Sequence, residues 1–252
     1  MDYNIFSTLT VCPNYRVHYI GHAPLSHLGE EFYDKTNLVN EVITERLRVN
    51  RHAPKVIREN YEANHVKPHE LMGALIVLKH EDIRPMLKKL GVDVVYVADM
   101  ICGMYQPYKN SYLFGLMQIL YSAIDVDRLD FITRDNVMVG GNFLSIDLER
   151  MINSYILDEN SLRIDYRGLS TIINFVNGRT SLYMWVINHH RNVLMSGLLA
   201  EFIREVKSSS DVTITHKDFI DKSLNYMFSY EGICKSYIDD HDLIRLLMRK
   251  PD

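Results

Sequence analysis

Apolar residues recur every three or four positions along most of this chain, and this periodicity constrains the fold more than any other feature. Over residues 37–48 the recurring positions are Leu38, Val39, Val42, Ile43 and Leu47. Such spacing places apolar side chains on one face of a half-buried helix. Helical patterns also cover residues 70–79, 83–90, 144–156, 168–177, 182–206 and 239–248. We therefore predict a mainly α fold.

The remaining segments add one central helix and little β structure. Residues 112–124 are apolar nearly all round, which predicts a helix buried on most of its faces. Residues 92–97 fit either a strand or the start of a helix, and residues 162–165 fit one half of a small hairpin. No stretch has the composition of an interdomain linker. We expect a single helical domain over residues 1–252, with at most a small β hairpin.

The overall composition is that of a globular protein without a strong charge bias. The chain has 252 residues, of which 47% are hydrophobic and 24% charged, and its net charge is −4. This balance produces no overall basic field, so neither nucleic acid nor an anionic membrane is an expected partner. A few well-placed cations would still suffice to hold a nucleotide.

Cysteine usage and hydropathy indicate the compartment. Cys12, Cys102 and Cys234 lie far apart and form neither a CxxC pair nor a disulfide framework, which favours a reducing environment. The first residues lack the pattern of a signal peptide. The longest apolar runs, such as residues 71–78, are too short to span a bilayer. We expect a cytoplasmic protein.

Three histidines lie within ten residues near the start of the chain. His18, His22 and His27 are separated by Gly21 and Pro24, which predict a helix end followed by a turn. Neutral imidazoles bind transition metals, and protonated ones neutralise phosphate. Alternatively, these histidines cap helices or lie on the surface.

A second polar segment runs from Asp125 to Asp135. Asp127 and Asp130 are one helical turn apart, so on a helix their carboxylates can point the same way. Facing inward, they would need a metal ion or a guanidinium group. Facing outward, they would form ion pairs within a solvated helix. His69 lies at a predicted helix start after Pro68 and, taken alone, fits a helix cap.

In this order, the segments resemble the HD superfamily of phosphohydrolases, and most closely its dNTP triphosphohydrolase branch. The sequence HYIGHAPLSHLGE at residues 18–30 is similar to the family pattern HDIGHxPFSHxxE. The sequence DVDRLDFITRDNVMVG at residues 125–140 is similar to DxDRLDYLxRDxxxxG. Residues 147–150, 168–190 and 237–243 resemble later segments of the family. The similarity thus covers most of residues 18–248.

The resemblance implies an HD-domain-like helical bundle with a buried site. Residues 18–140 would carry the metal and phosphate site, and residues 141–252 would form a C-terminal helical region. In active relatives four protein ligands hold one transition metal or Mg²⁺ ion, and a dNTP is hydrolysed to nucleoside and triphosphate. Family members are commonly oligomeric, so we expect a homo-oligomer that binds a dNTP or a related nucleotide.

The resemblance also implies roles for individual residues. His18 and Asp127 match metal ligands. The catalytic positions are His22, His27 and His69, with Glu30 at the place of an acid that orients them. Substrate-binding positions are Arg128, Phe131, Asp135 and Arg179, where Phe131 replaces the usual Tyr. Ile187 occupies a position at which the family often has a Tyr that stacks on the ribose.

Two departures bear on activity. Tyr19 replaces the aspartate of the metal-binding pair, and a phenol with a pKa near ~10 is a poor substitute for a carboxylate ligand. The early histidine ligand has no counterpart in the seventeen residues before His18, as expected for an N-terminally shortened relative. Losing ligands should cost more than the ~10–100-fold typical of an outer-shell partner.

Three functional interpretations follow from these departures. The first, which we favour, is a degenerate relative or pseudoenzyme that keeps a nucleotide or polyphosphate pocket, with impaired or absent metal-dependent hydrolysis and no required metal. The second is an active triphosphohydrolase of the dGTP type that uses Mg, Mn, Fe or Zn. The third is a chain whose early metal ligand comes from a partner subunit.

Overall fold

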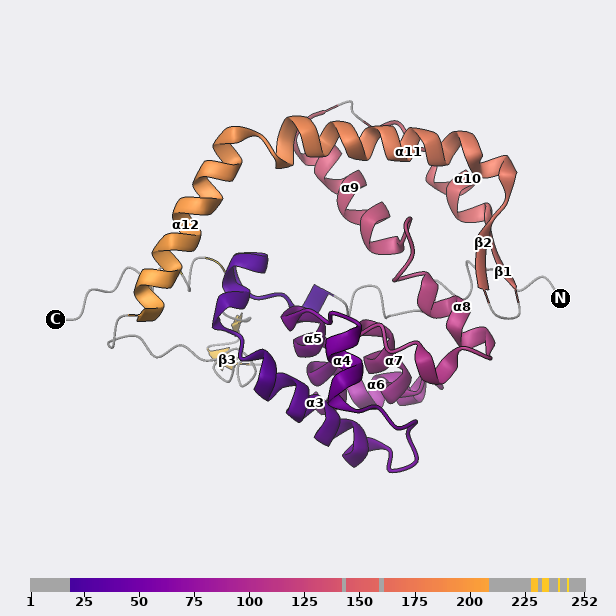
Figure 1. The fold of residues 1–252 in the computed structure, drawn as a ribbon, viewed down its shortest axis with the longest axis vertical. Helices are drawn as coiled ribbons and strands as arrows, with labels where there is room; N and C mark the ends of the chain where they lie inside the picture. The colour runs from indigo at the N-terminus through magenta and orange to yellow at the C-terminus, as the bar shows by residue number, and fades with distance from the viewer. Residues whose placement is uncertain are drawn as a thin grey trace. The chain divides into compact units, whose positions relative to one another are not determined.

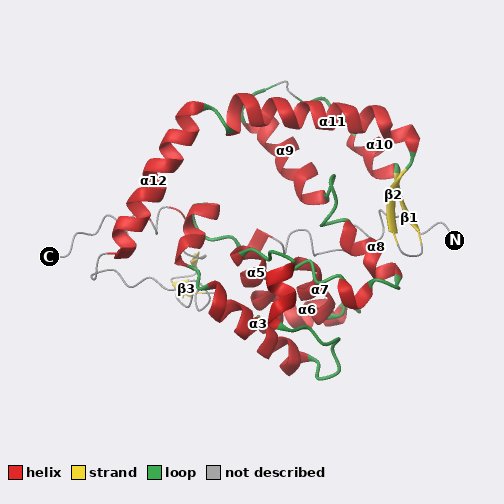
Figure 2. Ribbon diagram, viewed as in Figure 1, coloured by secondary structure: helices red, strands yellow, loops and turns green. Residues whose placement is uncertain are grey.

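The computed structural model describes residues 19–141, 144–158 and 161–208, together with residues 228–230, 233–235, 240 and 244. These residues are mostly helical (Figure 2), which confirms the predicted mainly α fold. β1 (Tyr155–Asp158) and β2 (Ser161–Ile164) form the expected antiparallel hairpin, and β3 (Phe228–Tyr230) and β4 (Ile233–Lys235) add a second one. Within the described residues, no helix has both the length and the apolar character that crossing a bilayer requires.

The described chain divides into two compact units. We call residues 19–104, with the described residues from 196 onward, the histidine unit, and residues 105–195 the hairpin unit. The single domain expected over residues 1–252 stays a prediction, because compactness alone does not establish whether a unit folds independently.

Helix α5 (Pro68–Lys79) is the centre of the histidine unit. Its residues 69–78 are all buried, and it packs against α3 (Lys35–Val49) and α7 (Val94–Ile101) (Figure 1). The other elements of this unit are η1 (Tyr19–Gly21), η2 (Ser26–Phe32), α4 (Arg58–Ala63), α6 (Ile83–Lys89), the C-terminal part of α12 (His190–Ser208) and the β3–β4 hairpin. The open question at residues 92–97 is resolved as a helix start, because the Asp93 carboxylate accepts a hydrogen bond from the Val95 N–H at 2.8 Å.

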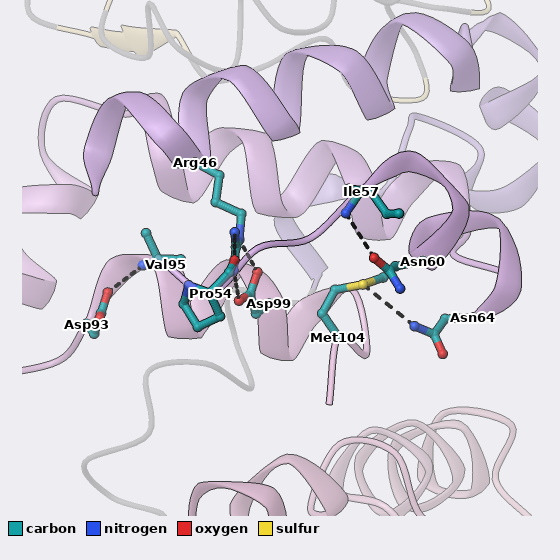
Figure 3. Close-up of polar contacts among 9 residues, drawn as sticks. All are labelled: Arg46, Pro54, Ile57, Asn60, Asn64, Asp93, Val95, Asp99 and Met104. Carbon is teal, nitrogen blue, oxygen red and sulfur yellow. Dashed lines mark hydrogen bonds and ion pairs between the residues drawn. The ribbon is translucent and has the colours of Figure 1, made fainter. Parts of the chain in front are cut away.

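A buried ion pair joins α3 to α7 (Figure 3). Arg46 Nε and Nη2 each donate to a carboxylate oxygen of Asp99 at 2.6 Å, and Nη1 donates to the carbonyl of Pro54 at 2.6 Å. Both side chains are almost completely buried. This bidentate pairing neutralises a guanidinium and a carboxylate that would each be costly to bury without a partner.

The hairpin unit is built around α9 (Val126–Met138) and α11 (Leu169–Leu182). It also contains η3 (Gln106–Tyr108), α8 (Tyr112–Gln118), α10 (Leu148–Asn153), the β1–β2 hairpin, η4 (Tyr166–Gly168) and the π-helix η5 (Tyr183–Ile187). In this unit α11 packs against α9 and α10, and α8 packs against the hairpin (Figure 1). Its core consists of Ile124, Leu129, Ile132, Leu144, Met151, Phe175 and Leu182.

Two predicted helices are shorter than expected. The helix expected over residues 112–124 ends at Gln118. Tyr112 at its start is 61% exposed, whereas its other residues are buried or half-buried, which agrees with the predicted burial on most faces. After Gln118 the chain turns through residues 119–124 and reaches Asp125, whose extended backbone and carboxylate cap α9. The helix expected over residues 144–156 covers only Leu148–Asn153, between the cap at Asp147 and strand β1.

Of the helices expected over residues 182–206 and 239–248, the first is interrupted and the second lies mostly outside the described residues. The helical stretch expected over residues 182–206 is interrupted by η5 and a turn before α12 begins at His190. Most of the helix expected over residues 239–248 lies outside the described residues, although Asp240 and Ile244 are helical.

Candidate functional site

Four of the residues singled out in the sequence meet in the histidine unit. His22, His27, Glu30 and His69 each offer one ligand-type atom, and these atoms lie within 4.8 Å of one another. The rings of His22 and His69 stack with centroids 4.2 Å apart, and the His27 ring lies 5.3 Å from His22 and 5.1 Å from His69. We call these four residues the histidine cluster.

The start of α5 positions His69. Pro68 occupies the first turn, where its fixed φ suits a helix and its missing N–H is not needed. The Glu70 carboxylate accepts a hydrogen bond from the Lys67 N–H at 2.7 Å, which completes the N-terminal cap. His69 therefore projects from a fixed helix end, with only 3% of its side chain exposed.

Gly21 brings His22 close to α5. A Cβ at Gly21 would overlap the backbone carbonyl of His69 and the backbone nitrogen of Gly73. Only glycine therefore allows η1 to pack directly on the α5 backbone. The Tyr33 hydroxyl, on the residue that follows η2, donates to the Gly21 carbonyl at 3.2 Å and supports the same position.

A tight turn carries the chain from His22 to His27. Leu25 and Ser26 both have left-handed backbones, with φ of 61° and 52°. Such conformations cost about 1–3 kcal/mol for residues other than glycine and persist only when the surroundings impose them. One support is a hydrogen bond at 2.7 Å from the Leu25 N–H to Oδ1 of Asp240, a residue of the late 237–243 segment.

Glu30 connects two of the three imidazoles. Its Oε1 lies 2.5 Å from Nδ1 of His27 and 2.7 Å from Nδ1 of His69. Burial alone would raise the pKa of Glu30, but the hydrogen bonds from the two histidines and their charges outweigh burial and lower it to about 2. Glu30 is thus an ionised acceptor near neutral pH, and both Nδ1 atoms must donate to it.

This arrangement determines what the imidazoles can do. With Nδ1–H directed at Glu30, a neutral His27 or His69 ring has a lone pair on Nε2 that can accept a proton or bind a metal ion. A protonated ring can instead donate from Nε2 to a phosphate oxygen. The His27 side chain is 65% exposed, so the cluster is open to solvent on that side and closed at His69.

Apart from His18, the remaining site predictions lie in the hairpin unit. Asp127, Arg128, Phe131 and Asp135 are on α9, and Arg179 is on α11. Phe131 packs against the core of this unit, and the Arg179 guanidinium lies 5.5 Å from the centre of the Tyr183 ring. Asp130 pairs with Arg134 one turn along the helix, as the solvated-face alternative predicts. Ile187 is the last residue of η5. Nucleotide roles for these positions stay predictions.

Asp125 is a residue whose importance the sequence patterns did not single out. Its carboxylate accepts the Arg128 N–H at 2.7 Å and pairs with the Arg128 guanidinium, which also donates to the Ser122 carbonyl at 2.7 Å. Burial raises the pKa of Asp125 to about 6, against the lowering effect of the Arg128 hydrogen bond and charge. The usable signal was an aspartate directly before a helical stretch, which is the common N-cap pattern.

The metal site implied by the resemblance is not made up by the described residues. His18 lies outside them, and the sequence has a tyrosine at position 19 where the metal-binding pair has an aspartate. Asp127 belongs to the hairpin unit. Because this donor set does not fit the four-ligand site, we derive no chemical step through it.

Comparisons with known proteins give partial similarities. No family model matches the chain. It is 24% identical over 144 residues to the uncharacterized protein YwfO of Bacillus subtilis, covering 57% of this chain and 32% of that protein. It is 25% identical over 181 residues to the uncharacterized MG461 homolog of Mycoplasma pneumoniae, covering 70% and 36%. The chain thus spans about a third of the length of these relatives.

One similar solved structure is a phosphohydrolase from Bacteroides thetaiotaomicron. The match has a TM-score of 0.44 and 20% sequence identity, and it covers 68% of this chain and 44% of that one.

Proposed function

We propose that this chain is a phosphohydrolase-type protein that binds a nucleoside triphosphate or related polyphosphate at the histidine cluster, with impaired or absent metal-dependent hydrolysis. The observation that carries the proposal is the shared carboxylate. Glu30 holds His27 and His69 by Nδ1 at 2.5 Å and 2.7 Å, which orients two imidazoles around one point.

Phosphate binding follows from the chemistry of this group. Imidazolium rings donate strong hydrogen bonds to phosphate oxygens, and a buried partner keeps their orientation. The His27 side is open to a ligand, whereas His69 is held by the start of α5. The nucleotide class is supported by the resemblance of residues 18–30 and 125–140 to dNTP triphosphohydrolases.

Weak turnover is supported by Tyr19. A phenol stays protonated near neutral pH and binds a hard cation poorly, so the aspartate of the family's metal-binding pair has no chemical equivalent here. The imidazoles can still bind and orient a phosphate without it. Binding and hydrolysis are therefore separable properties of this chain.

A binding assay with matched variants tests the proposal. We expect each of the four dNTPs to raise the melting temperature of the purified protein, because a ligand that binds only the folded state stabilises it. His27→Ala and His69→Ala should weaken binding by about 10-fold or more, given the ~1.5–3 kcal/mol typical of a hydrogen bond to a charged group. His52→Ala, on an exposed turn outside the cluster, should leave binding unchanged.

The same samples distinguish the outcomes. Absence of stabilisation by any dNTP would overturn the binding proposal. Catalytic release of triphosphate that His69→Ala abolishes would instead establish an active triphosphohydrolase and overturn the impaired-hydrolysis part.

A further inference from the structure

The histidine cluster also has the composition of a metal site. We propose that it binds a divalent transition-metal ion such as Zn²⁺ through one nitrogen each of His22, His27 and His69, while Glu30 orients two of these rings. This site is separate from the ligand set that the resemblance implies, since it uses neither His18 nor Asp127. It requires no nucleotide, so it does not rest on the function proposed above.

The donor types select the kind of ion. Imidazole is a borderline-soft ligand that suits Zn, Cu, Ni and Fe, whereas Mg²⁺ and Ca²⁺ prefer oxygen donors. Three imidazoles from one small region match the three-ligand form of a zinc site, which keeps one coordination position open. Such a position would accept water or an oxygen of an anionic ligand.

The spacing of the donors is close to what an ion needs. Two nitrogens that each lie about 2.1 Å from a tetrahedral ion are roughly 3.4 Å apart. The ligand-type atoms of the cluster lie within 4.8 Å of one another, so they would have to approach by at most about 1.4 Å. The His27 side chain is 65% exposed, so small adjustments that keep its Nδ1–H on Glu30 can supply part of this approach.

Glu30 orients the rings of two histidines, as the outer partners of a histidine metal site do. Histidine ligands nearly always donate their other ring N–H to a carboxylate or carbonyl, which holds the ring and increases its basicity. Glu30 already accepts Nδ1–H from both His27 and His69, which leaves Nε2 of each ring chemically available as a metal ligand. It also places one negative charge beside the three neutral rings.

The frame around the cluster is prearranged. Gly21 lets η1 approach the α5 backbone, and Pro68 begins the helix that carries His69. A Cβ at Gly29 would overlap the carbonyl of Pro24, so the turn between His22 and His27 also packs closely on η2. Such rigidity reduces the ordering needed when an ion binds.

Metal binding to the purified full chain tests this inference. The protein is stripped with a chelator and titrated with Zn²⁺ alone by calorimetry, and metal content is measured after gel filtration. We expect one ion per chain. His22→Ala and His69→Ala should each weaken binding at least 100-fold, and Glu30→Gln should weaken it by about 10–100-fold, as loss of an orienting partner does.

Control variants locate the ion. His52→Ala and the double variant His18→Ala/Asp127→Asn should both bind Zn²⁺ as the unaltered chain does. If the double variant loses the ion while His69→Ala keeps it, or if the unaltered chain binds no ion at equimolar Zn²⁺, the inference is overturned.

Folding of the variants is checked by circular dichroism without metal. If His69→Ala fails to fold, His27→Ala provides the test, because its exposed ring can be removed without opening the core. Undiminished Zn²⁺ binding by folded His27→Ala would overturn the three-histidine site. Loss of Zn²⁺ binding with retained dNTP stabilisation, or the reverse, separates this inference from the proposed function.

Discussion

At the scale of single residues, two carboxylates in similar settings have opposite electrostatic behaviour. Glu30 is held by two imidazoles, and its pKa falls to about 2 despite burial. Asp125 caps a helix and pairs with one arginine, yet burial raises its pKa to about 6. Partners prevail over burial at Glu30, and burial prevails at Asp125.

Asp125 predicts a pH dependence of stability. Because its pKa is raised from 3.8 to about 6 in the folded state, this group destabilises the fold as pH rises through that window. The full effect is up to about 3 kcal/mol, at roughly 1.4 kcal/mol per pKa unit. Asp125→Asn keeps an oxygen for the cap and removes the titration.

Urea unfolding of both proteins between pH 3.5 and 7 measures this effect. The free energy of unfolding of the unaltered chain, relative to that of Asp125→Asn, should fall between about pH 4 and pH 6. A constant difference across this range would show that Asp125 titrates normally.

At the scale of elements, the close approach of η1 to α5 builds the histidine cluster. We predict that Gly21→Ala destabilises the protein by about 3 kcal/mol and weakens Zn²⁺ binding, because its Cβ would overlap the α5 backbone and push His22 away. Gly197→Ala, where a Cβ meets no atom within 4 Å, should stabilise α12 by up to about 1 kcal/mol. Chemical denaturation compares the two. Equal stability of both variants would contradict the close packing at Gly21.

The contact between α3 and α7 depends on the Arg46–Asp99 pair. Asp99→Ala leaves a buried guanidinium without its carboxylate, so we predict a loss of about 3–5 kcal/mol in the free energy of unfolding. Glu62→Ala removes the exposed partner of Arg58 and should change stability by less than about 1 kcal/mol. A similar small effect for both would show that the Arg46 charge is solvated or accommodated elsewhere.

At the scale of the whole molecule, the sequence pattern predicted α3, which buries one face, and α5, which is buried all round, close to their observed bounds. It overextended α8, because the apolar pattern continues through residues 119–124, where the backbone forms turns before Asp125 caps α9. It also overextended α10, since a cap at Asp147 and a hairpin at Tyr155 limit that helix from both sides. Turn and cap chemistry thus prevailed over periodicity.

Part of the histidine cluster could be predicted from the sequence. Spacing alone placed His22 and His27 on one turn, but their proximity to His69 comes from tertiary packing of η1 on α5 and was expected only from the resemblance. The bridging role of Glu30 depends on distances that no spacing rule supplies. The homo-oligomer stays a prediction, which sedimentation of the purified chain would check.

Phosphorus NMR of dGTP mixed with an equal amount of protein, first without metal and then with added Mg²⁺ or Zn²⁺, tests the central claim most directly, since it observes binding and metal-dependent hydrolysis in one sample. We predict that the triphosphate resonances shift or broaden, that His69→Ala restores their free positions, and that no inorganic triphosphate accumulates. Resonances identical to those of free dGTP would contradict binding at the histidine cluster, and steady appearance of inorganic triphosphate would contradict impaired hydrolysis.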